Sequence, residues 1–245
     1  MSGHSKWATI KRKKGETDAK RGKLFTKIGR EIAVAVKEGG SDPASNTKLR
    51  DAIAKAKTNN MPGENIARSI KKAAGDGNAD NFEDIIYEGY GPGGVAVVVE
   101  ALTDNRNRAA GNMRHYFDKF GGNMGTSGCV MFMFDRKGVI LIENDDDGTV
   151  SEEKLLLDAL EAGADDVATE AEYFEVTTHP NDFSAVRDAL EGMGYAFAEA
   201  EIQYIPQTEA KLANEQDTLM MSRLIEFLED DDDVQAVWHN WEMTS

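Results

Sequence analysis

Basic side chains near the start of the chain form two groups whose spacing suits phosphate binding. The first group precedes residue 15 and consists of Lys6, Lys11, Arg12, Lys13 and Lys14, with the indole of Trp7 among them. The second group recurs every three or four residues, as on one side of a helix, and consists of Lys20, Lys23, Lys27 and Arg30, with Arg21 adjoining. Ammonium and guanidinium groups form charge-assisted hydrogen bonds with phosphate oxygens, and an indole can stack on an unpaired base. These residues therefore predict contact with a nucleic-acid backbone.

The charge of the chain divides sharply after residue 74. Residues 1–74 hold 18 Lys and Arg against 7 Asp and Glu, a net +11, and residues 75–245 hold 10 against 37, a net −27. Because a fold depends on its apolar pattern and not on net charge, this sorting favours a polyanionic partner for the basic part. Two alternatives stay open: the lysines form an ordinary solvated face, or the basic segment docks onto the acidic remainder of its own chain.

A third basic group opens a predicted helix inside the acidic region. It consists of Arg106, Arg108 and Arg114. Arg106 and Arg108 either extend the phosphate-binding surface or pair with carboxylates of the acidic region, and the sequence favours neither.

The sequence lacks the motifs that nucleotide binding, metal binding and nucleophilic catalysis require. Gly89–Gly94 lacks the Lys-Ser/Thr of a phosphate loop, and Gly121–Gly125 leads into a strand instead of a helix. Asn144–Gly148 resembles a calcium loop, but Lys154 falls where the bidentate glutamate is required. The four histidines are far apart, and no nucleophile motif is present. We therefore expect no metal, no cofactor, no small-molecule substrate and no enzymatic activity.

The basic region is predicted to be helical. Apolar residues recur at helical spacing over residues 18–38, 47–58 and from Pro62 to residue 74, and Gly39-Gly40 ends the first of these helices. Gly75–Asn78 marks a boundary, after which the period changes to that of strands, expected at residues 85–87, 95–102 and 130–134, with a helix over 106–120.

An internal echo predicts the architecture of the next segment. Leu157–Gly163 is matched thirty residues later by Arg187–Gly194, and each copy ends a helix that leads to a strand. With strands near 139–143, 166–170, 173–178 and 200–205, this gives strand–helix–strand twice, the ferredoxin-like unit. A helix over 215–228 and a strand over 234–238 would then complete the earlier module, and Glu229–Asp233 between them is expected to be an acidic surface at a helix end.

The predicted fold class is α+β, with an N-terminal three-helix domain and two ferredoxin-like domains, the third inserted into the second. The expected domains are a basic helical domain (1–77), an acidic α+β domain (78–136 plus 207–245) and the inserted domain (137–206). Cys129, the single cysteine, lies in an apolar run and is expected to be buried and inert. One cysteine fits a reducing compartment, and no stretch approaches the about 18 apolar residues of a membrane span. A cytoplasmic protein without a membrane partner is expected.

Seven segments, taken together, resemble the YebC family of bacteria and its mitochondrial relative. They occur in the family's order over nearly the whole chain and are Gly3–Trp7, Asp18–Ile28, Asn59–Pro62, Tyr87–Gly94, Asp104–Arg108, Gly121–Gly125 and Leu228–Val234. Ala109 stands where many members carry Thr, which removes any hydroxyl contact at that position. The resemblance implies three domains and a cytoplasmic, non-enzymatic regulator of gene expression.

The resemblance implies two kinds of regulator, and a third class stays open. Family members are commonly labelled DNA-binding transcriptional regulators, whereas the mitochondrial relative is a translational activator and bacterial members are linked to ribosomes and to relief of stalling on proline-rich nascent chains. The basic residues are mostly lysines, which suit phosphates better than base edges, so ribosomal RNA is favoured and DNA stays open. The third class is a protein-interaction module whose acidic part recruits a basic partner.

Overall fold

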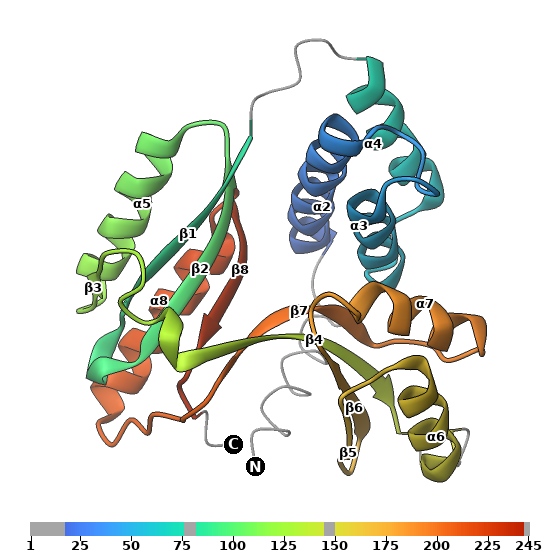
Figure 1. Ribbon diagram of the computed structural model, residues 1–245. Coiled ribbons are helices and arrows are strands. Elements are labelled where there is room, and N and C mark those ends of the chain that lie inside the picture. The colour runs from blue at the N-terminus through green and yellow to red at the C-terminus, as the bar shows by residue number, and fades with distance from the viewer. Residues whose placement is uncertain (1–17, 76–81, 145–149, 243–245) are drawn as a thin grey trace.

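The computed structural model describes residues 18–75, 82–144 and 150–242 and has an α+β architecture (Figure 1). A three-helix N-terminal domain lies beside two four-stranded antiparallel sheets, each with its own helices. This confirms the predicted fold class. Within the described residues, no helix is long and apolar enough to cross a membrane.

The N-terminal domain packs three helices around a small aliphatic core. The helices are α2 (Asp18–Gly39), α3 (Thr47–Thr58) and α4 (Gly63–Gly75). Asn46 starts α3 because its side-chain oxygen accepts from the backbone N–H of Leu49 at 3.0 Å, and its amide donates to the Ala35 carbonyl at 2.7 Å. One buried asparagine therefore ties the start of α3 to the end of α2.

The middle sheet has the order β3-β1-β2-β8 and takes its last strand from the C-terminal end of the chain. Its elements are β1 (Glu83–Tyr90), β2 (Ala96–Thr103), α5 (Arg106–Lys119), β3 (Asn123–Met124), α8 (Glu215–Asp230) and β8 (Val234–His239), with a short 3-10 turn at Pro92–Gly94. Helices α5 and α8 bury one core with the sheet, including Val97, Val99, Met113, Phe117 and Leu224. The loop between α8 and β8 thereby lies beside the start of α5.

The inserted segment folds as the echo predicts. Its elements are β4 (Phe134–Glu143), α6 (Glu152–Ala162), β5 (Asp166–Thr169), β6 (Tyr173–Thr178), α7 (Phe183–Gly192) and β7 (Glu199–Pro206). The strand order β5-β6-β4-β7 is the one that two strand–helix–strand units produce. Both copies of the echo end in a glycine with left-handed backbone, Gly163 at φ +100° and Gly194 at φ +96°.

One predicted strand is wrong. Residues 130–134 were expected to be extended, but Met131–Met133 forms a 3-10 turn before β4 begins. The carboxylate of Glu88, only 4% exposed, accepts from the backbone N–H groups of Gly128, Val130 and Met131 at 2.6, 2.9 and 2.7 Å. A side chain thus takes the donors that a strand ladder would use.

Polar contacts fix the N-terminal domain against the inserted domain. Arg187 of α7 is 2% exposed and places Nη1 2.8 Å from Asp51 of α3, while Ser184 donates to the same carboxylate at 2.9 Å. Lys55 of α3 lies 2.8 Å from Glu31 and 4.0 Å from Glu201 of β7. Burial alone would lower the pKa of Lys55, but these carboxylates raise it, so the lysine stays charged. These contacts set where the basic face of α2 points.

Candidate nucleic-acid interface

The basic face of α2 is turned toward the loop between α8 and β8. We call Lys20, Lys23, Lys27 and Arg30 the basic stripe, and Glu229–Asp233 the acidic turn. Along the stripe the side chains become less exposed, from the exposed Lys20 to Arg30, whose side chain is 23% exposed. Opposite charges in the two segments, about 200 residues apart in sequence, therefore face each other across the boundary between two domains.

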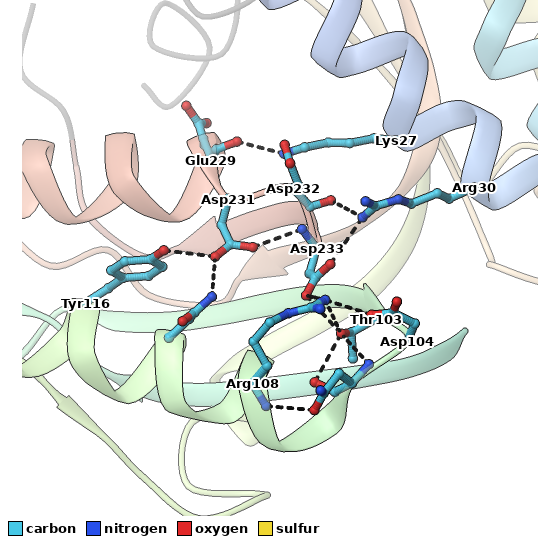
Figure 2. A network of polar contacts seen from close by, with 12 residues as sticks. Lys27, Arg30, Thr103, Asp104, Arg108, Tyr116, Glu229, Asp231, Asp232 and Asp233 are labelled. Carbon is cyan, nitrogen blue, oxygen red and sulfur yellow. Dashed lines mark hydrogen bonds and ion pairs between the residues drawn. The ribbon is translucent and has the colours of Figure 1, made fainter. Parts of the chain in front are cut away.

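Three residues of the stripe bind the acidic turn directly. Lys23 lies 2.6 Å from a carboxylate oxygen of Asp230. Lys27 donates to the backbone carbonyl of Glu229 at 2.7 Å, and Figure 2 shows its side chain reaching across from α2. Arg30 donates to the Asp232 carbonyl at 2.6 Å and to the Asp233 carboxylate at 3.2 Å.

The acidic turn is held in shape by its own domain. Asp231 accepts from the Tyr116 hydroxyl at 2.9 Å and from the backbone N–H of Asp233 at 2.9 Å. Asp233, with a side chain 5% exposed, accepts from Thr103 at 2.9 Å and from Arg108 at 2.7 Å (Figure 2). The turn therefore presents its carbonyl oxygens and exposed carboxylates in a fixed array, whether or not α2 lies against it.

The two lysines of this contact have different electrostatic environments. The hydrogen bond from Lys23 to Asp230 raises the pKa of Lys23. Burial lowers the pKa of Lys27, against the attraction of Asp231 and Asp232. Lys27 thus carries a partly desolvated charge whose direct acceptor is a neutral carbonyl, and an anionic acceptor would stabilise it better.

Arg108 and Arg106 both pair with carboxylates of the acidic region, which is one of the two roles that the sequence left open. Arg108 binds Asp104 at 2.8 Å as well as Asp233, so it belongs to the cluster around the acidic turn. Arg106 is 3.8 Å from Glu83, with both side chains largely exposed, and Arg114 is exposed. Arg108 therefore helps to hold the acidic turn in place, whereas Arg106 forms an exposed ion pair with Glu83.

The remaining predicted residues fall into two sets. One set lies outside the described residues and consists of Lys6, Trp7, Lys11, Arg12, Lys13 and Lys14. The other set, Lys20 and Arg21, lines an open groove of about 1150 Å³ between α2, α8 and the strands β7 and β8. Among its lining residues, the side-chain amide of Gln235 and the indole N–H of Trp238 are buried without a hydrogen-bond partner in the described chain. The groove therefore presents basic side chains to a ligand, whereas these polar atoms are covered by the protein.

Catalytic or metal chemistry finds little support in the described residues. They contain no group of three or more His, Cys, Asp and Glu that could hold a metal ion. Cys129 is partly buried, and burial together with Glu88 raises the pKa of its thiol, which disfavours the nucleophilic thiolate.

Sequence reasoning missed how the acidic turn is used. Glu229–Asp233 was expected to be an acidic surface, but Asp231 and Asp233 are bound within their own domain and the backbone carbonyls of Glu229 and Asp232 accept from α2. The sequence shows only that two charged segments have opposite signs. That predicts attraction between the segments but does not predict which of their atoms come into contact.

Comparisons with known proteins agree over the full length of the chain. Residues 5–76 match the family "TACO1/YebC protein N-terminal domain", and residues 82–241 match "TACO1/YebC second and third domain". A "Probable transcriptional regulatory protein" of Acetivibrio thermocellus is 62% identical over 241 residues, covering 98% of this chain and 99% of that protein. A protein of the same description from Ruminiclostridium cellulolyticum is 60% identical over 242 residues, covering 99% and 97%.

A crystal structure shares the fold. It is that of the conserved hypothetical protein Aq1575 from Aquifex aeolicus, with a TM-score of 0.81 and 46% sequence identity over 94% of this chain and 93% of that one. The resemblance drawn from the motifs is therefore confirmed: the chain belongs to the TACO1/YebC family, whose members are regulatory proteins and not enzymes.

Proposed function

We propose that this protein regulates gene expression by binding nucleic acid through its basic N-terminal domain, and that its target is ribosomal RNA. The main support is the division of charge, +11 before residue 75 and −27 after it. A basic domain is attracted to phosphates, while an acidic remainder is repelled by them, so the molecule meets a polyanion in one orientation. The relatives' description as probable transcriptional regulatory proteins supports a role in gene expression.

The chemistry of the basic residues favours backbone contacts over base reading. Lysines outnumber arginines both among residues 6–14 and along the basic stripe. Lysine acts as a point charge for phosphate, whereas base edges are read by bidentate Arg, Asn or Gln. We therefore expect binding that depends strongly on salt and weakly on sequence.

RNA is favoured over duplex DNA for a geometric reason. A duplex-reading protein presents a rigid helix with base-reading side chains to the major groove, whereas the basic face of α2 carries three lysines and one arginine, which suit phosphates. Single strands and loops of RNA can instead follow a basic surface and offer unstacked bases to an aromatic residue such as Trp7. On the ribosome, the protein would help translation past difficult sequences such as proline-rich ones.

The second candidate is a DNA-binding transcriptional regulator. It is favoured by the relatives at 62% and 60% identity, which are described as probable transcriptional regulatory proteins. It would require protection of a discrete promoter site at physiological salt.

Ribosome sedimentation at low and high salt separates these candidates. The full-length protein should sediment with ribosomes at low salt and leave them at high salt, because counterions compete for each phosphate contact. A variant with residues 11–14 changed to Gln should lose this association. The matched control removes four other basic residues of the same domain, Lys57, Arg68, Lys71 and Lys72, all exposed, and should still sediment.

Two results would contradict the proposal. Equal losses in the two variants would mean that net charge and not a defined surface mediates the association. A wild-type protein that is absent from ribosomes at low salt but protects one promoter sequence would establish the transcriptional candidate instead.

A further inference from the structure

The acidic turn offers the basic stripe a set of oxygens like those of a nucleic-acid backbone. Lys23, Lys27 and Arg30 each hold at least one oxygen of the turn, at distances of 2.6 to 3.2 Å. These are the distances of charge-assisted hydrogen bonds to phosphate. The side chains proposed to bind phosphates are thus already occupied within the chain.

We propose that the acidic turn is an internal competitor of nucleic acid, covering Lys23, Lys27 and Arg30 in the free protein and giving them up when a phosphate backbone binds. This inference rests on the proposed function, since it describes how the same basic surface is regulated. Binding would separate the face of α2 from the acidic turn and so couple nucleic-acid binding to the position of the N-terminal domain.

The contact has the strength expected of a reversible one. Lys23 and Asp230 are 46% and 65% exposed, and exposed ion pairs are weak and screened by salt. Lys27 binds a neutral carbonyl, although burial lowers its pKa, so a phosphate would be a better acceptor for it. A competing polyanion therefore gains more from these cations than the acidic turn does.

Neither partner depends on the contact for its own shape. The acidic turn is fixed by Tyr116, Thr103 and Arg108 of its own domain. The N-terminal domain is held together by its own aliphatic core, which includes Ile28, Ile32 and Leu49. The two faces can therefore separate without unfolding either domain, as a competitive mechanism requires.

The test removes two of the exposed carboxylates of the turn. Asp230 and Asp232 lie at the surface, so the double variant D230N/D232N should fold. Its affinity for a fluorescent oligouridylate about 20 nucleotides long should rise about threefold to tenfold, because a larger fraction of the protein is open. The matched control, E161Q/E191Q, makes the same change in net charge at exposed residues of α6 and α7. It should bind no more than about twofold tighter, which is the size expected of the general charge effect.

Chemical footprinting of the wild-type protein gives an independent measurement. On addition of the same RNA, carbodiimide labelling of Asp230 should increase and amine labelling of Lys23 and Lys27 should decrease. This measurement needs no substitution and decides the matter even if the variant folds poorly.

The results distinguish a failure of the internal competitor from a failure of the proposed function. If the wild type binds RNA but D230N/D232N binds no tighter than the control, and Asp230 labelling does not change, the competitor is wrong and the proposed function stands. If the wild type and both variants bind no RNA at low salt, the proposed function is wrong, and the competitor with it.

Discussion

His239 on β8 should make the stability of the protein fall in mild acid. Burial lowers its pKa to about 4, and its Nδ1 atom is buried without a hydrogen-bond partner in the described part of the chain. The folded protein therefore holds this imidazole neutral, whereas the unfolded chain protonates it near the ordinary pKa of 6.5.

The direction and size of the effect follow from linkage. Above pH 6.5 the side chain is neutral in both states, so its full contribution is present. As the pH falls from 6.5 toward 4, only the unfolded chain takes up the proton, and the free energy of unfolding decreases by about 1.4 kcal/mol per pH unit. Between pH 7 and pH 5 the loss from this residue alone should be about 2 kcal/mol.

Urea denaturation at pH 7 and pH 5 measures this loss. Trp238 and Trp241 flank His239 and provide a fluorescence signal from the same strand end. The variant His239→Gln cannot titrate, so the wild type should lose about 2 kcal/mol more than the variant between the two pH values. Carboxylates elsewhere titrate equally in both proteins and cancel in the comparison. A difference below about 0.5 kcal/mol would show that His239 is protonated normally in the folded state.

Two substitutions test side chains that organise the backbone. Glu88→Gln should lower the free energy of unfolding by about 2 kcal/mol, because one charged acceptor serves three backbone N–H groups. Urea denaturation measures this loss, with the exposed substitution Glu161→Gln as the control. A loss equal to that of the control would be inconsistent with the role of Glu88. Asn46→Ala should cost about 2 kcal/mol by removing the α3 cap and the amide bonds to Ala35 and Gly40. Circular dichroism during the same titration should show the loss in helical signal, and an unchanged midpoint would contradict it.

Local signals in the sequence predicted most secondary-structure elements. Helix α3 was predicted over Thr47–Thr58 and has those bounds, since its cap and its apolar period lie within neighbouring residues. The inserted domain was predicted from an echo whose glycines, Gly163 and Gly194, end helices in the left-handed conformation. Information confined to one turn of helix or one strand suffices for such elements.

The errors occur where a distant side chain decides the structure. Residues 130–134 satisfy the pattern of a strand, but Glu88, about 40 positions earlier, takes their backbone donors. Likewise, nothing near Lys27 indicates that its acceptor is the carbonyl of Glu229, 202 positions later. A pattern in one segment cannot report a partner that only the folded chain brings close.

The charge division on which the sequence analysis relied has two consequences, and they oppose each other. A basic domain of +11 attracts phosphates, and it attracts the acidic remainder of −27 for the same reason. In the folded chain the second attraction is satisfied along α2, by Lys23, whose side chain is 46% exposed, and by Arg30, whose side chain is 23% exposed. Under the proposed competition, a polyanion would meet the more exposed Lys23 before Arg30, from the end of α2 that continues in sequence toward the basic residues 6–14. From there it can displace the acidic turn one contact at a time, Lys23 before Lys27 and Lys27 before Arg30, so that no step exposes more than one unpaired charge.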